Sequence, residues 1–416
     1  MSIFRFPGRY VAKLTDPTFW TGFFDRSTYS GKSVTEQSAM QLDAVWACIK
    51  LNAETLGSLP LHLIDKKTNE PASDHHLYEI LHDAPNPETT SVEYWEAVGM
   101  ALNLYGNSYS EILRAGDADD GEIIGLNFLS PSYTSVERDG VGNRHYWYED
   151  PGRTRRRISE NRMFHIRAMS LCDDLGMSPI EFGRNVIGNA LATEETSGRL
   201  FANGLQSAGA LSTPNLLNDK QRAQVEQNMQ KYVGSKNAGK LMVLEAGFAY
   251  HNLQMNPQTA QMLEVRSYSI EQICRLFGVP PIMIGHASQG QTMWGSGVEQ
   301  IVLSYSKLGL RSMCKRVEAA IRRDLMTPAQ RRRYKAEFSL EGLLRGDSAS
   351  RAEFYSKLSQ NGVLTRNEIR ALENRPLAGE EGDKLTVQSN LCFLDQLHEI
   401  PAGRAPASSP DPENEE

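Results

Sequence analysis

The segment GSKNAGKL at residues 234–241 comes within one residue of a phosphate-binding loop. In the pattern G-x-x-x-x-G-K-[ST], backbone amides of the loop surround the phosphates, the lysine binds them, and the last hydroxyl coordinates Mg²⁺. Gly234, Gly239 and Lys240 fit this pattern, but Leu241 stands where the hydroxyl is required. Two hypotheses follow: a nucleotide-driven enzyme with a degenerate loop, or a turn without nucleotide chemistry.

The elements expected around this segment favour the turn. A phosphate-binding loop follows a strand and begins a helix, so that amides at the helix N-terminus face the phosphates. Here residues 218–233 predict a helix and residues 240–253 predict a strand, which is the reverse order. We therefore expect a helix-to-strand turn that carries Lys236 and Lys240 and binds no nucleotide.

No other motif of catalysis or metal binding is assembled in the sequence. The patterns H-E-x-x-H, G-x-S-x-G and G-x-G-x-x-G are all missing. The five cysteines are scattered and never spaced as C-x-x-C. This usage predicts reduced thiols in a cytoplasm-like compartment and argues against a zinc site. We therefore predict no enzymatic activity, no cofactor and no metal.

Two local patterns resemble metal ligands but have simpler explanations. His75-His76 precedes a short predicted helix, so a surface cap is expected there. DADDGE at 117–122 resembles a calcium loop, but its acidic spacing breaks and Phe128 stands where a bidentate Glu belongs. We expect a hairpin turn at this segment.

Composition describes a soluble protein with an uneven charge distribution. The chain has 416 residues, enough for two or three domains, and no apolar run of membrane-spanning length. Its start lacks the apolar stretch of a signal peptide. The net charge is −7, yet residues 297–335 carry ten Lys and Arg against three Asp and Glu. The remainder is strongly acidic, which argues against tight nucleic-acid binding over the whole surface.

Runs of like charge leave their partners open. The arginine runs at 153–157 and 331–333 could contact nucleic acid, and inter-subunit salt bridges explain them equally well in an acidic protein. The acidic pairs Asp173-Asp174 and Glu194-Glu195 lie in or beside predicted helices. A solvated face is the usual explanation for such pairs.

Hydrophobic periodicity and cap signals predict the elements that must position these residues. Apolar residues at helical spacing predict a helix over 38–59, followed by the strand PLHLI. Thr89 or Thr90 would cap a later helix, and Asn218 or Asp219 would cap the polar helix before the phosphate-loop look-alike.

The chain then changes from β-rich to helical. Residues 107–170 consist of short β-rich runs separated by Gly, Pro, Asp and Asn. Ser178 as a cap and Pro179 at the first position begin a helix that is expected to end at Gly204. A long basic amphipathic helix is expected over 298–326.

The order of these segments resembles the portal proteins of tailed bacteriophages. The N-terminal resemblance lies in QLDAVWACIKLNAETLGSLPLHL and HHLYEILHDAPNPETTSVEYWEAVGMALNLYGNSYSEI. DDLGMSPIEFGRNVIGNALATEETSGRLFANG and EVRSYSIEQICRLFGVPPIMIG are similar to the middle signatures of the family. GLLRGDSASRAEFYSKLSQNGVLTRNEIRALENRPLAGEEGD resembles its C-terminal end, so the resemblance spans about residues 35–390.

The resemblance implies an α+β portal fold in a ring oligomer, usually a dodecamer. Such a fold has a mixed α/β wing, a helical stem, a small α/β clip, a long helix crossing the wing and a helical crown. The implied divisions are an N-terminal arm (1–34), wing (35–217), stem helix (218–233), clip (234–256), second stem helix (257–283), tunnel loop (284–297), long wing helix (298–339), crown (340–392) and disordered tail (393–416).

The resemblance also implies where function lies. The tunnel loop would face DNA, and its neutral polar composition suits sliding, because each phosphate neutralised by Lys or Arg strengthens binding. The basic segment would then meet acidic neighbours in the ring rather than DNA. The residues implied in the channel are His286, Ser288, Gln289, Gln291 and Thr292, and those implied in partner docking at the clip are Lys236, Asn237 and Lys240.

The implied function is a channel at one capsid vertex through which double-stranded DNA is packaged and ejected. The implied partners are further copies of the chain, the terminase large subunit that hydrolyses ATP, the major capsid protein and a head-tail adaptor, with no membrane. The protein would act in the virion and pass through the host cytoplasm during assembly. The alternatives are another DNA-packaging or DNA-binding ring protein, such as a translocase with a degenerate phosphate loop, a nuclease, or a shorter ring adaptor.

Overall fold

The computed structural model describes residues 28–116, 121–139, 141–150, 152, 154–170, 174–202, 209–214, 218–230, 249–252, 259–286, 297–340, 348–373 and 375–386. The chain divides into two compact units, residues 1–342 and 343–416. The larger unit combines helices with antiparallel sheets, in agreement with the predicted α+β class, and the described part of the smaller unit is helical. None of the helices in the described segments has the length and apolar character needed to cross a bilayer.

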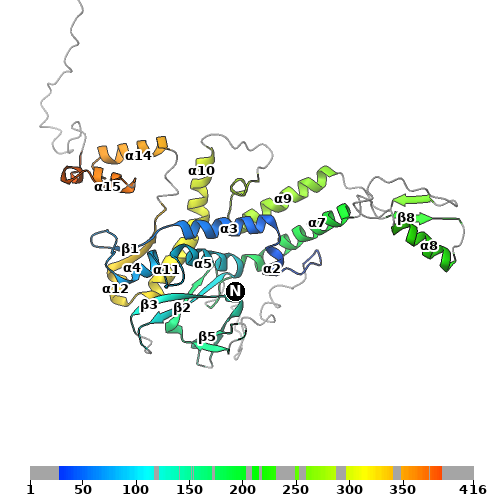
Figure 1. The fold of residues 1–416 in the computed structure, drawn as a ribbon, viewed down its shortest axis with the longest axis horizontal. Coiled ribbons are helices and arrows are strands. Elements are labelled where there is room, and N and C mark those ends of the chain that lie inside the picture. Colours follow the sequence, from blue (N-terminus) through cyan, green and yellow to red (C-terminus); the bar gives the residue numbers. More distant parts are fainter. Residues whose placement is uncertain are drawn as a thin grey trace, which may run out of the picture. The chain divides into compact units, whose positions relative to one another are not determined.

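Two packed helices form the centre of the larger unit's core, α3 (Asp43–Ser58) and α5 (Ser91–Tyr105) (Figure 1). They approach so closely that a Cβ at Gly99 would lie 2.9 Å from Ala53 Cα. Any larger residue at Gly99 would therefore push the α3 backbone away. The apolar stripe that the sequence predicted on α3 is buried and includes Val45, Ile49, Ala53 and Leu56.

Two helix caps form from residues that the sequence offered as alternatives. The Thr90 hydroxyl accepts from the Glu93 amide at the start of α5, and the Glu93 carboxylate accepts from the Thr90 amide at 2.9 Å. Asn218 and Gln221 exchange the same pair of bonds at the start of α8 (Asp219–Gln230). Each exchange satisfies amides that lack a partner within the helix.

One of the two patterns that resembled metal ligands has the simpler role predicted for it, and most of the other, residues 117–120, lies outside the described residues. The His75 ring accepts from the Leu77 amide and caps α4 (His76–His82). Arg114 pairs with Ile123 across an antiparallel hairpin, so the chain between them connects two adjacent strands. Among the described residues, no group of three His, Cys, Asp or Glu side chains is placed to hold a metal ion.

Antiparallel sheets complete the larger unit. Strand β1 pairs with β10, while the two three-stranded sheets have the orders β3-β2-β7 and β4-β5-β6. These two sheets share an apolar cluster of Tyr109, Leu129, Val136, Tyr146, Ile158 and Met163. The strands are β1 (Leu61–Asp65), β2 (Asn107–Arg114), β3 (Ile123–Leu129), β4 (Thr134–Arg138), β5 (Arg144–Tyr148), β6 (Arg156–Ile158), β7 (Met163–Arg167) and β10 (Tyr334–Phe338).

Two further helices, α7 (Arg184–Ala202) and α9 (Thr259–Phe277), lie side by side (Figure 1). Strand β8 (Gly209–Ser212) follows α7 and pairs antiparallel with β9 (Ala249–Asn252), which precedes α9. The predicted strand over 240–253 is therefore present in its described part. The phosphate-loop look-alike at 234–241 lies outside the described residues.

The long basic helix is confirmed, but its turns are not uniform. It runs from Gly297 to Leu325 and includes two π-helical stretches, which are rare and often occur at functional sites. The segments are α10 (Gly297–Ser304), the π-helical η5 (Tyr305–Leu310), α11 (Arg311–Ala320) and the π-helical η6 (Ile321–Leu325).

The remaining elements are α2 (Glu36–Ala39), η1 (Pro131–Tyr133), η2 (Glu160–Arg162), α6 (Pro179–Phe182), η4 (Pro281–Ile284), α12 (Pro328–Arg333) and, in the smaller unit, α14 (Ser348–Gln360), α15 (Arg366–Leu372) and η7 (Glu380–Asp383).

Candidate functional site

His286 is the one predicted site residue that falls within the described part of the chain. It follows η4, and its Nε2 lies 3.1 Å from the Ser267 hydroxyl of α9. The start of the predicted tunnel loop is thus attached to α9. The other predicted residues lie outside the described residues: Ser288, Gln289, Gln291 and Thr292 of the loop, and Lys236, Asn237 and Lys240 of the clip.

Backbone contacts hold together the two helices that flank the predicted loop. Gly278 ends α9 with a φ of 67°, a conformation that glycine adopts at little cost. A Cβ at Gly309, in η5 beyond the loop, would lie 2.7 Å from the Gly278 carbonyl oxygen. The helices before and after the loop therefore meet through two glycines, and the loop starts and ends on one framework.

A buried polar network fixes this framework to the core. Asn52 of α3 donates to Asn103 Oδ1 at 3.1 Å and to the Phe277 carbonyl at 3.3 Å, and accepts from the Tyr305 hydroxyl at 2.8 Å. Burial raises the pKa of Tyr305 to about 12, so its hydroxyl remains a donor at neutral pH. Buried polar groups that are fully paired favour one arrangement of the elements that carry them.

This network was not predicted from the sequence. Asn52 lies at helical spacing from the buried apolar residues Ile49 and Leu56. A polar residue in such an apolar stripe was the one sequence feature that could have indicated a buried polar contact. No comparable sequence feature indicates that Tyr305 takes part in the network. Its role depends on the packing of the long helix against α3.

A cavity of about 330 Å³ adjoins the network. Its lining is mostly apolar, with Phe277 and Met313 among the side chains, and Arg316 adds a positive charge. Phe182 also lines the cavity, although 60% of its surface is exposed. An exposed aromatic side chain beside an apolar hollow is typical of a surface that another protein covers.

The acidic pair at 194–195 is not a plain solvated face. Glu194 of α7 accepts from Arg266 of α9 at 3.2 Å, which joins the two helices. Glu195 forms ion pairs with Lys32, near the start of the described chain, and with Arg199. Partial exposure limits the strength of each pair, but together they hold α7 to its neighbours.

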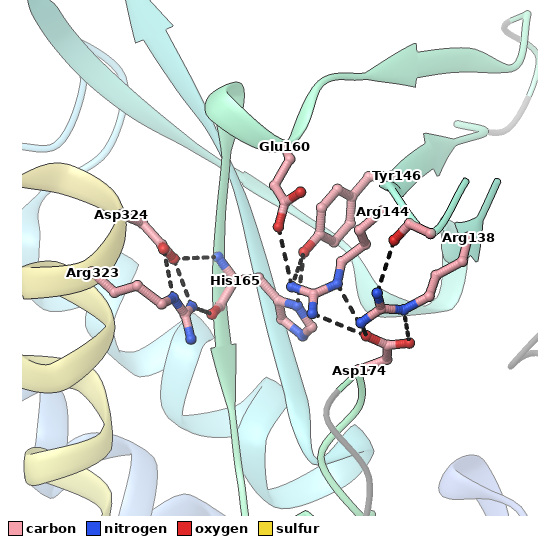
Figure 2. A network of polar contacts seen from close by, with 9 residues as sticks. Arg138, Arg144, Tyr146, Glu160, His165, Asp174, Arg323 and Asp324 are labelled. Atoms are coloured by element: carbon pink, nitrogen blue, oxygen red, sulfur yellow. Dashed lines mark hydrogen bonds and ion pairs between the residues drawn. The ribbon is translucent and has the colours of Figure 1, made fainter. Parts of the chain in front are cut away.

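Asp174 is also not simply solvated, because it lies between two arginines (Figure 2). Its carboxylate accepts from Arg138 Nε at 2.6 Å and from Arg144 Nη2 at 2.9 Å, and 16% of the side chain is exposed. The hydrogen bond from Arg138 is the main cause that lowers the pKa of Asp174, with Arg144 adding to it. The loop after β7 is thereby tied to β4 and β5.

The same network reaches a fully buried histidine (Figure 2). His165 Nδ1 lies 3.2 Å from the Tyr146 hydroxyl, and Nε2 lies 3.1 Å from Asn107 Oδ1. Because an amide oxygen only accepts, Nε2 carries the proton and Nδ1 accepts from Tyr146. Burial lowers the pKa of His165 well below its usual value, so the ring is neutral and acts as a structural bridge.

Three arginines of the two runs have carboxylate partners within the chain, which neither hypothesis for these runs included. Arg156 forms two hydrogen bonds with the Glu111 carboxylate, and Arg155 pairs with Glu137 at 3.1 Å. Arg333 donates to Asp65 at 2.7 Å. The sequence could not show these pairs, because the partners lie in strands distant along the chain.

In the long helix and the residues after it, by contrast, many cations have no partner among the described side chains. Five of the ten cations in 297–335 are exposed and have no hydrogen bond or ion pair with another described side chain. The α11 segment, between η5 and η6, carries two of the five. The five are Lys307, Arg311, Arg316, Arg322 and Arg332.

The described geometry is that of a structural framework: packed helices joined by a buried polar network, with exposed cations on the long helix and an apolar hollow beside the network. Residues 43–374 match the phage portal protein family. The chain therefore belongs to this family of structural proteins, whose members form the channel for double-stranded DNA in phage particles.

Individual relatives agree with this assignment. The chain is 33% identical to the portal protein of Enterobacteria phage HK97 over 362 residues, which cover 86% of this chain and 84% of that protein. Its fold is similar to an HK97 family phage portal protein from Corynebacterium diphtheriae, with a TM-score of 0.58, 14% identity, and coverage of 76% of this chain and 99% of that one. A chain in the neck of a native GTA particle with C12 symmetry matches with a TM-score of 0.55, 21% identity, and coverage of 89% and 96%.

Proposed function

We propose that twelve copies of this chain form a ring at one capsid vertex and that residues 284–297 line the channel for double-stranded DNA. The observation that carries the proposal is the framework around the loop, where Gly278 and Gly309 meet and Asn52 ties both flanking helices to the core. A constriction that passes DNA needs such a fixed base. The C12 symmetry of the GTA neck supports the subunit number.

We assign the stem to α7 and α9 rather than to α8 and α9. These two helices pack together, and the β8–β9 pairing joins the chain that leaves α7 to the chain that returns to α9. The segment 203–258, with β8, α8 and β9, would then form the clip. Lys236, Asn237 and Lys240 remain clip residues under this assignment, and they would contact the terminase large subunit and later a head-tail adaptor.

The remaining partners follow from the same proposal. The wing would contact the major capsid protein, and the ring would assemble in the host cytoplasm before it becomes part of the virion. The exposed cations of the long helix would meet acidic surfaces of neighbouring copies. Clustered positive charge on the bore would instead hold DNA by counterion release and slow its passage.

Adding positive charge to the loop tests the channel assignment. Gln289→Arg together with Gln291→Arg is expected to leave rings intact in negative-stain images and to slow or stall DNA packaging, most strongly at low salt. The matched control is Gln37→Arg with Gln41→Arg, which adds the same charge at two exposed positions near α2. Normal packaging by intact rings of the loop variant would contradict the assignment, and stalling by the control would show that added charge acts elsewhere.

A further inference from the structure

We infer that Cys48 and Cys274 constitute a latent disulfide site that can join α3 covalently to α9. The two residues are 226 positions apart in the chain, and their sulfur atoms lie 3.9 Å from each other. Both side chains are fully buried. Two thiols from distant segments are thus held in direct contact within the core.

The distance suits a reversible cross-link. A disulfide requires a sulfur–sulfur distance of about 2.05 Å, so each sulfur has to move by roughly 1 Å. Rotation about the Cα–Cβ bond moves a sulfur by this amount without displacing the helix axis. Cys314, the third buried cysteine in the described residues, has no hydrogen bond to either sulfur. Cys314 is therefore an internal control, because it is a buried cysteine with no sulfur atom as a hydrogen-bond partner.

The two thiols have different roles in the reaction. Cys48 donates its S–H to Cys274 Sγ, and this hydrogen bond is the main cause that raises the pKa of Cys48 and lowers that of Cys274. The thiolate is the nucleophile in thiol chemistry, so Cys274 is the sulfur that reacts first. Cys48 then resolves the product.

With a peroxide as oxidant, the reaction balances in two steps. The Cys274 thiolate attacks hydrogen peroxide, takes one oxygen to become a sulfenic acid, and one water is released after protonation. The Cys48 thiol then attacks the sulfenic sulfur, the S–S bond forms, and a second water leaves. Two electrons from the two thiols thus reduce one peroxide. Because both sulfurs are buried, local opening of the α3–α9 contact limits the rate.

The cross-link would fix the helix that carries the loop. α9 packs on α7 and leads into η4 and His286, while α3 is the central helix of the wing core. This consequence rests on the proposed function, in which α9 is a stem helix. A reducing cytoplasm would keep the site open during assembly, and an oxidising exterior would allow it to close in the particle. The chemical test below does not depend on that role.

Peptide mapping after oxidation tests the site directly. Trypsin places Cys48 in the peptide 33–50 and Cys274 in the peptide 267–275, so the cross-link joins two peptides that each contain one cysteine. Treatment of the purified full chain with hydrogen peroxide is expected to yield the joined peptides, and free thiols titrated in denaturant should fall from five to three. Dithiothreitol should reverse both changes.

Alanine variants separate the pair from general oxidation. Cys314→Ala should still give the joined peptides, whereas Cys48→Ala and Cys274→Ala should not, and circular dichroism checks that each variant is folded. A folded wild-type protein that keeps both thiols, or that oxidises each cysteine separately to sulfinic acid, would overturn the inference. Joined peptides that contain Cys314 instead would also overturn it.

Discussion

The arginines around the small sheets and the cations of the long helix have the same charge but opposite surroundings. Arg138 and Arg144 share one carboxylate, and Arg156 holds Glu111 with two bonds. Lys307 and Arg311 extend from the long helix without a partner among the described side chains. The first group is neutralised by carboxylates of the same subunit, and the second is not neutralised by any described side chain of that subunit. The number of charges in a segment therefore predicts little until their partners are known.

The strongest test of this contrast removes the shared carboxylate. Asp174→Asn should destabilise the protein by about 2 kcal/mol, because two arginines lose a charged acceptor in a site that is mostly buried. Denaturant unfolding of the larger unit measures the change. Asp74→Asn, at an exposed position, is the matched control and should change stability by less than about 0.5 kcal/mol. Equal stability of the two variants would show that the network contributes little.

Lowering the pH should remove the stabilisation that the Asp174 carboxylate provides. The Asp174 pKa is lower in the folded state, so its contribution is present above the unfolded value of about 3.9 and is lost as pH falls through the folded value. The stability difference between wild type and Asp174→Asn should therefore be constant near neutral pH and shrink below about pH 4. Unfolding measured across this range checks the sign. A difference that grows on acidification would contradict the depressed pKa.

Neutralising the free cations should alter assembly rather than folding. Lys307→Ala with Arg311→Ala and Arg316→Ala should change unfolding free energy by less than about 0.5 kcal/mol per site. Ring formation should slow and lose part of its salt dependence, because exposed charges mainly affect association rates. Light scattering at several salt concentrations measures this. Arg155→Ala with Arg156→Ala should show the reverse pattern, with lower stability and unchanged salt dependence.

The smallest effect is expected at the phosphate-loop look-alike. Lys240→Ala should leave ATP binding undetectable by calorimetry, as it should be for the unaltered protein, because the predicted element order places no helix N-terminus at the phosphates. Docking of the terminase large subunit should weaken modestly at low salt, since one cation is removed from the proposed clip. Lys67→Ala, at an exposed lysine outside the proposed clip, is the control. ATP binding that depends on Lys240 would reverse the interpretation of this segment.

Helix caps show how far local sequence carries a prediction. Thr90 with Glu93 and Asn218 with Gln221 each lie within one turn, so the pattern and the contact involve the same few residues. His75 capped α4 for the same reason. The apolar stripe of α3 was equally predictable, because helical spacing alone places its residues on one face.

Long-range partners were beyond such reasoning. Asp174 was expected on a solvated face, yet it contacts arginines 30 and 36 positions away because strand pairing brings β4 and β5 to its loop. The predicted stem began with the helix at 218–233, and only the packing of α7 against α9 suggested another pair.

The sequence by itself predicted the central helices, the candidate residues for their caps and the family, because these depend on neighbouring residues and on the order of segments. Only the tertiary structure decided which charges are paired, which polar groups lie in the core and which thiols meet. Electrostatic and hydrogen-bond energies depend on distance in space and on burial. Those two quantities are set when segments such as α3 and α9, far apart in the chain, pack together.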